Sequence, residues 1–173
     1  MQEITTNKDA MYELCKLVSS QPKYEKREYI INFIVKDGKA IATNGHLILF
    51  CDTDLEDGFY SPVNIQKKSI IVKSVDKFEF PEYNFFLSFE FTYRVKIMNT
   101  NGREYKEGDI YFETGGLCAS IGISLDNKYV EIAKKMKLSK CYFKDEKSPV
   151  LFENDGNKMF LMPIINNYEI EEI

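Results

Sequence analysis

His46 is the residue of this chain best suited to acid–base chemistry. It is the single histidine, and it follows Gly45 within a stretch of mostly apolar residues. An imidazole titrates near neutral pH, so it serves as a base or a proton donor. A nucleophilic mechanism also needs a positioned partner, and the sequence has no nucleophile elbow or flanking carboxylate pair. We therefore interpret His46 first as a structural turn residue, second as part of a peptide pocket or interface, and last as a catalytic base.

The cysteines are too dispersed for a typical zinc site. They are Cys15, Cys51, Cys118 and Cys141, each has apolar neighbours, and no two form a Cys-x-x-Cys pair. Zinc ligands usually occur at close spacing. We expect reduced cysteines in a hydrophobic core, no metal and no cofactor.

Five lysines in the region of a predicted helix near residue 126 have the chemistry to contact phosphate groups. They are Lys128, Lys134, Lys135, Lys137 and Lys140. Glu131 lies among them, which is typical of an ordinary solvated helix face. The chain has 27 acidic and 23 basic residues and a net charge of -4, so DNA contact would have to come from a local patch.

An apolar run near the end of the sequence offers a different kind of surface. Met159, Leu161, Met162 and Pro163 have soft side chains that suit peptide binding. The simpler interpretation is a strand in which either Met159 and Leu161 or Phe160 and Met162 are buried. We expect one of these two pairs to be buried in the core.

Size and composition predict one folded domain. A chain of 173 residues with 44% hydrophobic and 29% charged residues can bury a core without disulfides or metals. The aromatic content of 14% without tryptophan favours sheet. No apolar run is long enough to cross a bilayer and the N-terminus lacks signal-peptide features, so we expect a cytoplasmic protein without membrane contact.

Two helices are predicted from apolar periodicity. The first begins at Lys8 after Asn7 as its N-cap, and Pro22 bounds it. Its apolar face consists of Met11, Leu14, Cys15 and Val18. The second begins near Asp126 or Asn127. Its apolar face consists of Tyr129, Ile132, Ala133 and Met136.

The remainder of the sequence is rich in strand signals. We predict a strand over residues 29–35, a turn at Asp37-Gly38 and a second strand region over residues 40–50. Alternation predicts a strand with one buried face over residues 87–97 and further alternation over residues 117–123. Three short strands close the pattern, at residues 141–143, 150–152 and 159–162.

Several motifs, in the same order, resemble the bacterial sliding clamp, the β subunit of DNA polymerase III. Thr43-Asn44-Gly45-His46 is similar to the clamp signature Ala-Thr-Asp-Gly-His-Arg-Leu, and Phe80-Pro81-Glu82-Tyr83 is similar to Phe-Pro-Asp-Tyr. The later motifs are Asp126-Asn127-Lys128-Tyr129-Val130, Ser148-Pro149-Val150-Leu151 and Leu161-Met162-Pro163. Residues 4–53 and 121–165 carry the resemblance, so it covers most of the chain.

The resemblance implies a fold and two sites. The fold is α+β, a DNA-clamp-like domain of residues 1–173 in which two helices pack on antiparallel β-sheets, with an extra β-rich segment at 55–118 and an acidic tail at 167–173. In clamps the Gly-His and Met-Pro segments come from neighbouring domains and line a pocket for polymerase peptides. The corresponding residues here are Thr43, Gly45, His46, Leu47, Leu161, Met162 and Pro163. Clamp helices line a ring around DNA, which implies DNA binding by the five lysines.

Departures from the clamp pattern leave two functions open. A clamp subunit has three such domains and this chain has room for one, and Leu47 replaces the arginine that follows Gly-His in clamps. The first hypothesis is a non-enzymatic DNA-replication accessory protein that acts by tethering or self-association, with double-stranded DNA, replication-protein peptides and further copies of itself as partners. The alternative is a clamp-like protein–protein interaction module, of phage or mobile-element type, without DNA binding. An enzyme has the least support.

Overall fold

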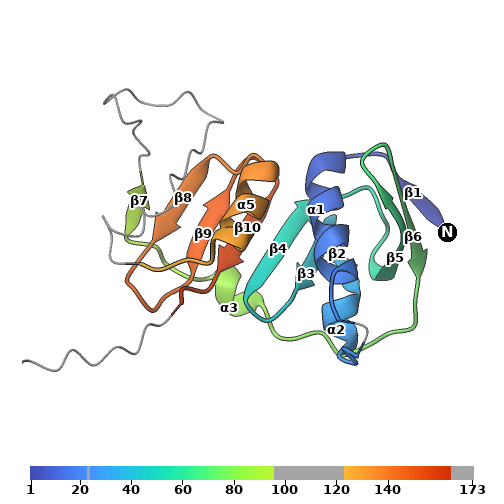
Figure 1. Cartoon of the computed structure of the whole chain (residues 1–173), viewed down its shortest axis with the longest axis horizontal. Coiled ribbons are helices and arrows are strands. Elements are labelled where there is room, and N and C mark those ends of the chain that lie inside the picture. The colour runs from blue at the N-terminus through green and yellow to red at the C-terminus, as the bar shows by residue number, and fades with distance from the viewer. Residues whose placement is uncertain (23, 96–122, 165–173) are drawn as a thin grey trace, which may run out of the picture.

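The computed structural model describes residues 1–22, 24–95 and 123–164 (Figure 1). The strands in this part are β1 (Gln2–Ile4), β2 (Phe33–Lys36), β3 (Lys39–Thr43), β4 (Leu47–Asp52), β5 (Gly58–Gln66), β6 (Ser69–Ser74), β7 (Tyr93–Val95), β8 (Lys140–Phe143), β9 (Val150–Glu153) and β10 (Lys158–Leu161). The helices are α1 (Lys8–Ser19), α2 (Glu28–Ile31), α3 (Asn84–Leu87) and α5 (Asn127–Lys135). The strands form one antiparallel ten-stranded sheet in the order β1-β6-β5-β2-β3-β4-β10-β9-β8-β7.

Two similar units meet at the centre of this sheet. In each unit a longer helix precedes three antiparallel strands, α1 before β2–β4 and α5 before β8–β10. The units join where β4 pairs antiparallel with β10, with Leu47 opposite Leu161 and Leu49 opposite Met159. The start of β4 therefore lies beside the end of β10, and this adjacency positions the candidate site.

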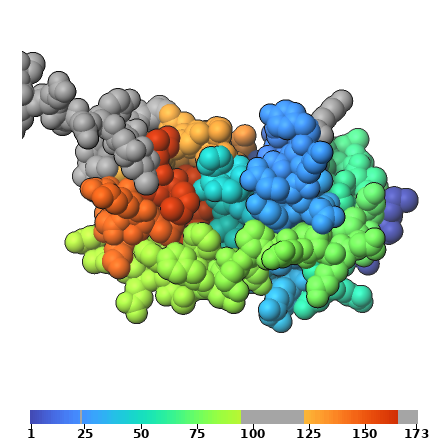
Figure 2. Space-filling model, turned by 90° about the horizontal axis from the view of Figure 1, so that it is seen from below, coloured from blue at the N-terminus to red at the C-terminus, as the bar shows by residue number. Residues whose placement is uncertain are grey.

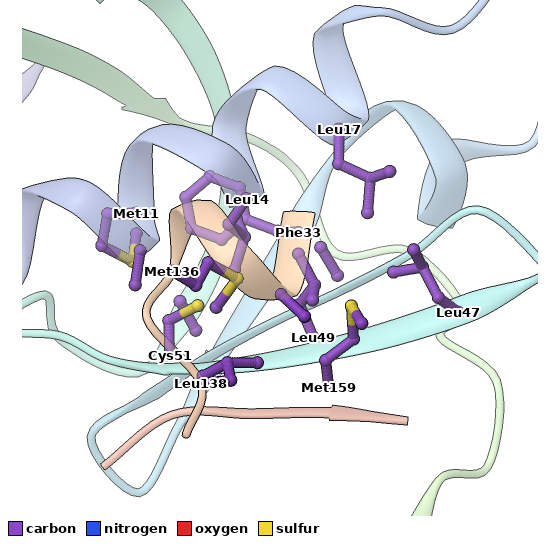
Figure 3. Packing of buried hydrophobic residues seen from close by; sticks show 14 of the residues in the cluster. Met11, Leu14, Leu17, Phe33, Leu47, Leu49, Cys51, Met136, Leu138 and Met159 are labelled. Atoms are coloured by element: carbon purple, nitrogen blue, oxygen red, sulfur yellow. The ribbon is translucent and has the colours of Figure 1, made fainter. Parts of the chain in front are cut away.

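The longer helices, α1 and α5, cover the core on one face of the sheet. Leu14 from α1, Leu49 from β4 and Met159 from β10 are fully buried there (Figure 3). Met136, at the C-terminal end of α5, is also buried in this core. The predicted α+β clamp-like fold, with two helices on antiparallel sheet, is confirmed.

Helix α1 agrees with its predicted start and apolar face but not with its predicted cap. Its four predicted apolar residues are all buried, and it ends before Pro22. Asn7 has a left-handed backbone and makes no capping bond. Its side chain instead donates to the Asp52 carbonyl at 3.0 Å and to Asn157 Oδ1 at 2.6 Å. The cap prediction is wrong because a tertiary contact, which ties the helix start to β4 and to the β9–β10 turn, takes the side chain.

The region predicted as two strands, residues 29–50, contains a short helix and three strands. Residues 28–31 form α2 and not strand, since the Ile30 N–H bonds the Arg27 carbonyl and closes a helical turn that buries Ile30. The Asp37-Gly38 turn is confirmed, and both residues have positive φ, as a tight hairpin requires. Residues 40–50 form two strands and not one, because the chain reverses at Gly45, whose φ of 87° favours glycine.

The second predicted helix and the last three predicted strands are confirmed. Helix α5 begins at Asn127, and the Asp126 side chain caps it by accepting from the Lys128 N–H at 3.0 Å. Of its predicted apolar face, Tyr129, Ala133 and Met136 are buried, and Ile132 packs partly buried beside them. Strands β8, β9 and β10 lie within one residue of their predicted bounds.

Residues 75–92, which we call the strap, run along the face of the sheet opposite α1 and α5. Figure 2 shows the strap as part of a light-green band that extends along the molecule. Five of its aromatic side chains, Phe78, Phe80, Tyr83, Phe86 and Phe91, pack with the sheet residues Ile34, Ile41, Ile48, Phe50, Leu151 and Phe160. The predicted strand at 87–97 is therefore wrong for residues 87–92, and its extended part within the described residues is β7. Aromatic rings supply large areas for covering an apolar sheet face, which explains why these residues leave the strand conformation.

Some predictions concern residues that the structure does not describe. The extra β-rich segment predicted at 55–118, as an elaboration of the domain or an insertion into it, contains β5, β6, the strap and β7 up to residue 95. Residues 96–118, Cys118, most of the alternation at 117–123 and the acidic tail at 167–173 lie outside the described residues. Within the described residues, the helices are too short or too polar to span a bilayer.

Candidate functional site

The turn between β3 and β4 is held by its own side chains. Thr43 Oγ1 donates to the Leu47 carbonyl at 2.7 Å and accepts from the Gly45 N–H at 3.1 Å. Asn44 Oδ1 accepts from the N–H groups of His46 and Leu47 at 3.0 and 3.2 Å. These bonds satisfy the turn's backbone locally, so His46 is presented from a fixed backbone.

A cavity of about 200 Å³ opens beside this turn. Three segments supply most of its walls, namely the turn at residues 43–48, the end of β10 with Met162, and the strap, and α2 adds Tyr29. Its lining residues are Tyr29, Thr43, Gly45, His46, Leu47, Ile48, Phe80, Pro81, Glu82, Tyr83, Phe86, Phe160 and Met162. The Met162 N–H donates to the His46 carbonyl at 3.0 Å, so the first two segments are joined directly.

The structure brings together five of the seven residues predicted to bind a peptide. Thr43, Gly45, His46, Leu47 and Met162 line the cavity. The other two, Leu161 and Pro163, are buried and lie outside its lining.

Strand β10 is buried on both faces of the sheet, so Met159 and Leu161 are core residues, as in the simpler interpretation. Met162, just after the strand, is the residue left for the predicted peptide binding. Met159 and Leu161 enter the core under the helices, and Phe160 packs with the strap. Met162, with 40% of its surface exposed, is left at the cavity.

The strap residues are the part of the cavity that sequence reasoning missed. Phe80, Pro81, Glu82 and Tyr83 form one wall together with Phe86. The signal was present, because residues 80–83 are the segment that resembles Phe-Pro-Asp-Tyr of clamps. It did not point to a site, since nothing in the local sequence says that the strap passes beside the β3–β4 turn.

The surroundings of His46 suit a wall residue better than a catalytic base. Its side chain is exposed and its ring stacks on Tyr129, with 5.9 Å between centroids. Tyr129 in turn receives a hydrogen bond from Asn44 Nδ2 at 3.0 Å. In the described part of the chain, no hydrogen bond joins the imidazole to a carboxylate or a thiol, as activation of a nucleophile would require.

The described cysteines are core residues. Cys15, Cys51 and Cys141 are buried and unpaired with one another. Burial raises the pKa of Cys15 and of Cys141 to about 12, and it also raises the pKa of Cys51. At neutral pH these groups are thiols and not thiolates, so they are poor nucleophiles and poor metal ligands. Among the described residues no group of three or more histidine, cysteine or acidic side chains is arranged to hold a metal.

Most of the lysines predicted to bind DNA have acidic neighbours. The pairs are Lys128 with Asp126 at 3.1 Å, Lys134 with Glu131 at 3.6 Å, Lys137 with Asp9 at 3.0 Å and Lys140 with Asp155 at 3.8 Å. Lys135 lines a polar cavity of about 330 Å³ between α1 and α5, together with Lys16, Lys128 and Glu13. On the face formed by α1 and α5, three lysines are thus grouped around this cavity, Lys16, Lys128 and Lys135.

The paired helices, and the two units that join at β4 and β10, define the fold of DNA sliding clamps. A search against protein-family models and a search of curated proteins give no match. Among solved structures, the putative DNA polymerase III β subunit of Eubacterium rectale matches with a TM-score of 0.56 and 8% identity, over 97% of this chain and 66% of that chain. The β subunit of Borrelia burgdorferi, solved with a natural product, matches with a TM-score of 0.53 and 11% identity, over 96% and 65%.

A third solved structure, the DNA polymerase sliding clamp of Pseudomonas aeruginosa, has a TM-score of 0.51 and 12% identity, over 94% of this chain and 66% of that chain. The chain thus spans just under two thirds of the length of each of these clamp chains. At such identities the likeness establishes the fold.

Proposed function

We propose that the protein is a non-enzymatic accessory of DNA replication that tethers a partner by binding one of its peptide segments in the cavity beside His46. One observation carries this proposal. The cavity unites, within one chain, the turn at residues 43–48 and Met162, which resemble the two halves of the clamp's peptide pocket. The bond from the Met162 N–H to the His46 carbonyl fixes the two halves against each other.

The size and lining of the cavity suit an apolar peptide side chain. A dry apolar cavity of roughly 150 Å³ can hold a molecule of benzene, and this cavity has about 200 Å³. Phe86, Phe160 and Tyr83 provide aromatic walls. Burial of one leucine or phenylalanine side chain contributes about 1.5–3 kcal/mol, and a preformed wall reduces the entropic cost of binding. An anchor residue of this kind would supply much of the affinity.

Met162→Lys is expected to weaken peptide binding by about tenfold or more, because it places a charge where an apolar anchor would be desolvated. Met162 is 40% exposed, so the fold should tolerate the change. The probe is a set of short synthetic peptides selected for binding to the wild-type protein, with affinities measured by fluorescence polarisation. Val63→Lys is the matched control, since Val63 is 51% exposed on β5 and is not among the lining residues. Equal affinities in both variants would contradict the proposal.

DNA binding by the helical face is the second candidate, and the convergence of Lys16, Lys128 and Lys135 favours it. We expect weak binding, because neighbouring carboxylates offset most of the other lysines and the net charge is -4. Retention of the protein by duplex DNA at low salt should fall steeply with added salt and be lost in Lys135→Glu, while Lys73→Glu on β6 should change it little. A monomer in light scattering that duplex DNA does not retain would instead favour an interaction module without DNA binding.

A further inference from the structure

The cavity beside His46 has an uneven charge. Among the described residues that line the cavity, Glu82 is the one acidic residue, and none is a lysine or an arginine. Leu47 also lines the cavity and contributes no charge. A bound peptide would therefore meet a carboxylate at the strap side of an otherwise mostly apolar site.

Two cations close to residues of this lining are paired with carboxylates. Arg27 lies two residues before the lining residue Tyr29, and its guanidinium donates to Glu25 Oε2 at 2.7 Å. This hydrogen bonding to Arg27 lowers the pKa of Glu25 to about 2, so the pair stays ionised at neutral pH. Lys128 lies over the Tyr129 ring, on which His46 stacks, and is paired with Asp126 at 3.1 Å. These two cations therefore do not neutralise Glu82.

The carboxylate of Glu82 is held in place and accessible. Glu82 Oε1 accepts from the Asn84 N–H at 2.9 Å, at the start of α3. The neighbouring residues Phe80 and Tyr83 pack with each other edge to face, with 6.0 Å between centroids, and both belong to the cluster under the sheet. The side chain itself is exposed. A fixed, solvent-accessible charge at the edge of a binding site acts on selectivity and association rate more than on total affinity.

We propose that the cavity selects peptides in which the apolar anchor is adjacent to a lysine or arginine. This inference rests on the proposed function, because it assumes that a peptide occupies the cavity. A basic residue beside the anchor would pair with Glu82, whereas an acidic residue there would be repelled. Exposed pairs are individually weak, so the expected contrast is about tenfold between a lysine and a glutamate at that position.

The test uses three synthetic peptides that share one anchor and differ only in the adjacent residue, which is lysine, glutamine or glutamate. In the wild-type protein at low salt, affinity should decrease in that order, and the spread should shrink at about 0.3 M salt. Glu82→Gln should reduce the spread to within about twofold. Glutamine keeps a carbonyl oxygen for the Asn84 N–H, so the strap should stay in place. Glu82→Lys should reverse the order.

Glu79→Gln is the matched control, because Glu79 is exposed on the same strap and does not line the cavity. This variant should retain the wild-type order of affinities. Binding that Met162→Lys weakens, but that does not depend on the charge of the peptide or on Glu82, would overturn this inference alone. Absence of binding by any peptide would overturn the proposed function, and the inference with it.

Discussion

Leu49→Ala is expected to lower the free energy of unfolding by about 2–5 kcal/mol, the range for removing a fully buried leucine. Leu49 has no exposed surface and lies on β4, opposite Ala42 of β3 and Met159 of β10. It belongs to the core under α1 and α5 (Figure 3). The cavity left by the missing methyl groups would lie at the junction of the two units, where neither helix can move in without breaking other contacts.

Urea denaturation followed by circular dichroism measures this effect, and Leu87→Ala provides the control. Leu87 is 53% exposed on α3, so the same substitution there should cost under about 1 kcal/mol. We also expect a single transition, since the core under the helices is continuous across β4 and β10. A loss under about 1 kcal/mol would contradict the expected rigidity of this junction, and a transition in two steps would show that the two units fold separately.

Leu49→Ala should also affect the candidate site. The pairing of β4 with β10 is what brings the turn at residues 43–48 against Met162. A loosened junction would increase the mobility of both walls, and peptide affinity should fall even though Leu49 does not line the cavity. The structural and functional consequences of this core position are therefore linked.

Gly156→Ala is expected to cost about 2–3 kcal/mol of stability, from two sources. Gly156 has a φ of 98°, which is strained for any residue with a Cβ, at a cost of about 1–3 kcal/mol. A Cβ at this position would also collide with the Asp52 carboxylate, which is paired with Lys39. Lys39 Nζ additionally donates to the Gly156 carbonyl at 3.1 Å. Lys39 of β3 therefore contacts both Asp52 of β4 and the turn between β9 and β10.

Comparison with Gly38→Ala separates the two sources. Gly38 has a φ of 71° and open space around the position of a Cβ, so its replacement costs only backbone strain. In a double-mutant cycle, Asp52→Ala should reduce the cost of Gly156→Ala to that of Gly38→Ala. Thermal denaturation of the four combinations at Gly156 and Asp52 measures the difference. If Asp52→Ala leaves the cost of Gly156→Ala unchanged, steric contact with the carboxylate is not its cause.

The elements that sequence reasoning located best are those with a local cause. Helix α5 follows from the Asp126 cap and an apolar face, and both are properties of neighbouring residues. The Asp37-Gly38 turn is another case, since both residues tolerate positive φ. Asn7 shows the limit of this reasoning. Its side chain was correctly placed at the helix start but bonds Asp52 and Asn157, which are distant in sequence.

The strap shows why the remainder could not be predicted. Alternating aromatic residues at 87–92 have the pattern of a half-buried strand, yet Phe89 and Phe91 pack with each other and not in a sheet ladder. Alternation reports that one set of side chains is apolar, and it does not report which surface they cover. That surface exists only after β2, β3, β4, β9 and β10 have assembled and exposed an apolar face.

The sequence by itself determined the two longer helices, the Asp37-Gly38 turn, the three C-terminal strands, the core position of Cys15, Cys51 and Cys141, and the motifs around His46 and Met162. It could do so because periodicity, turn chemistry and residue type act over a few neighbours. The tertiary structure decided that the two motifs share one cavity, that the strap completes it and that Glu82 stands in its wall. The physical reason is the antiparallel pairing of β4 with β10, a contact between distant segments whose register no local pattern specifies.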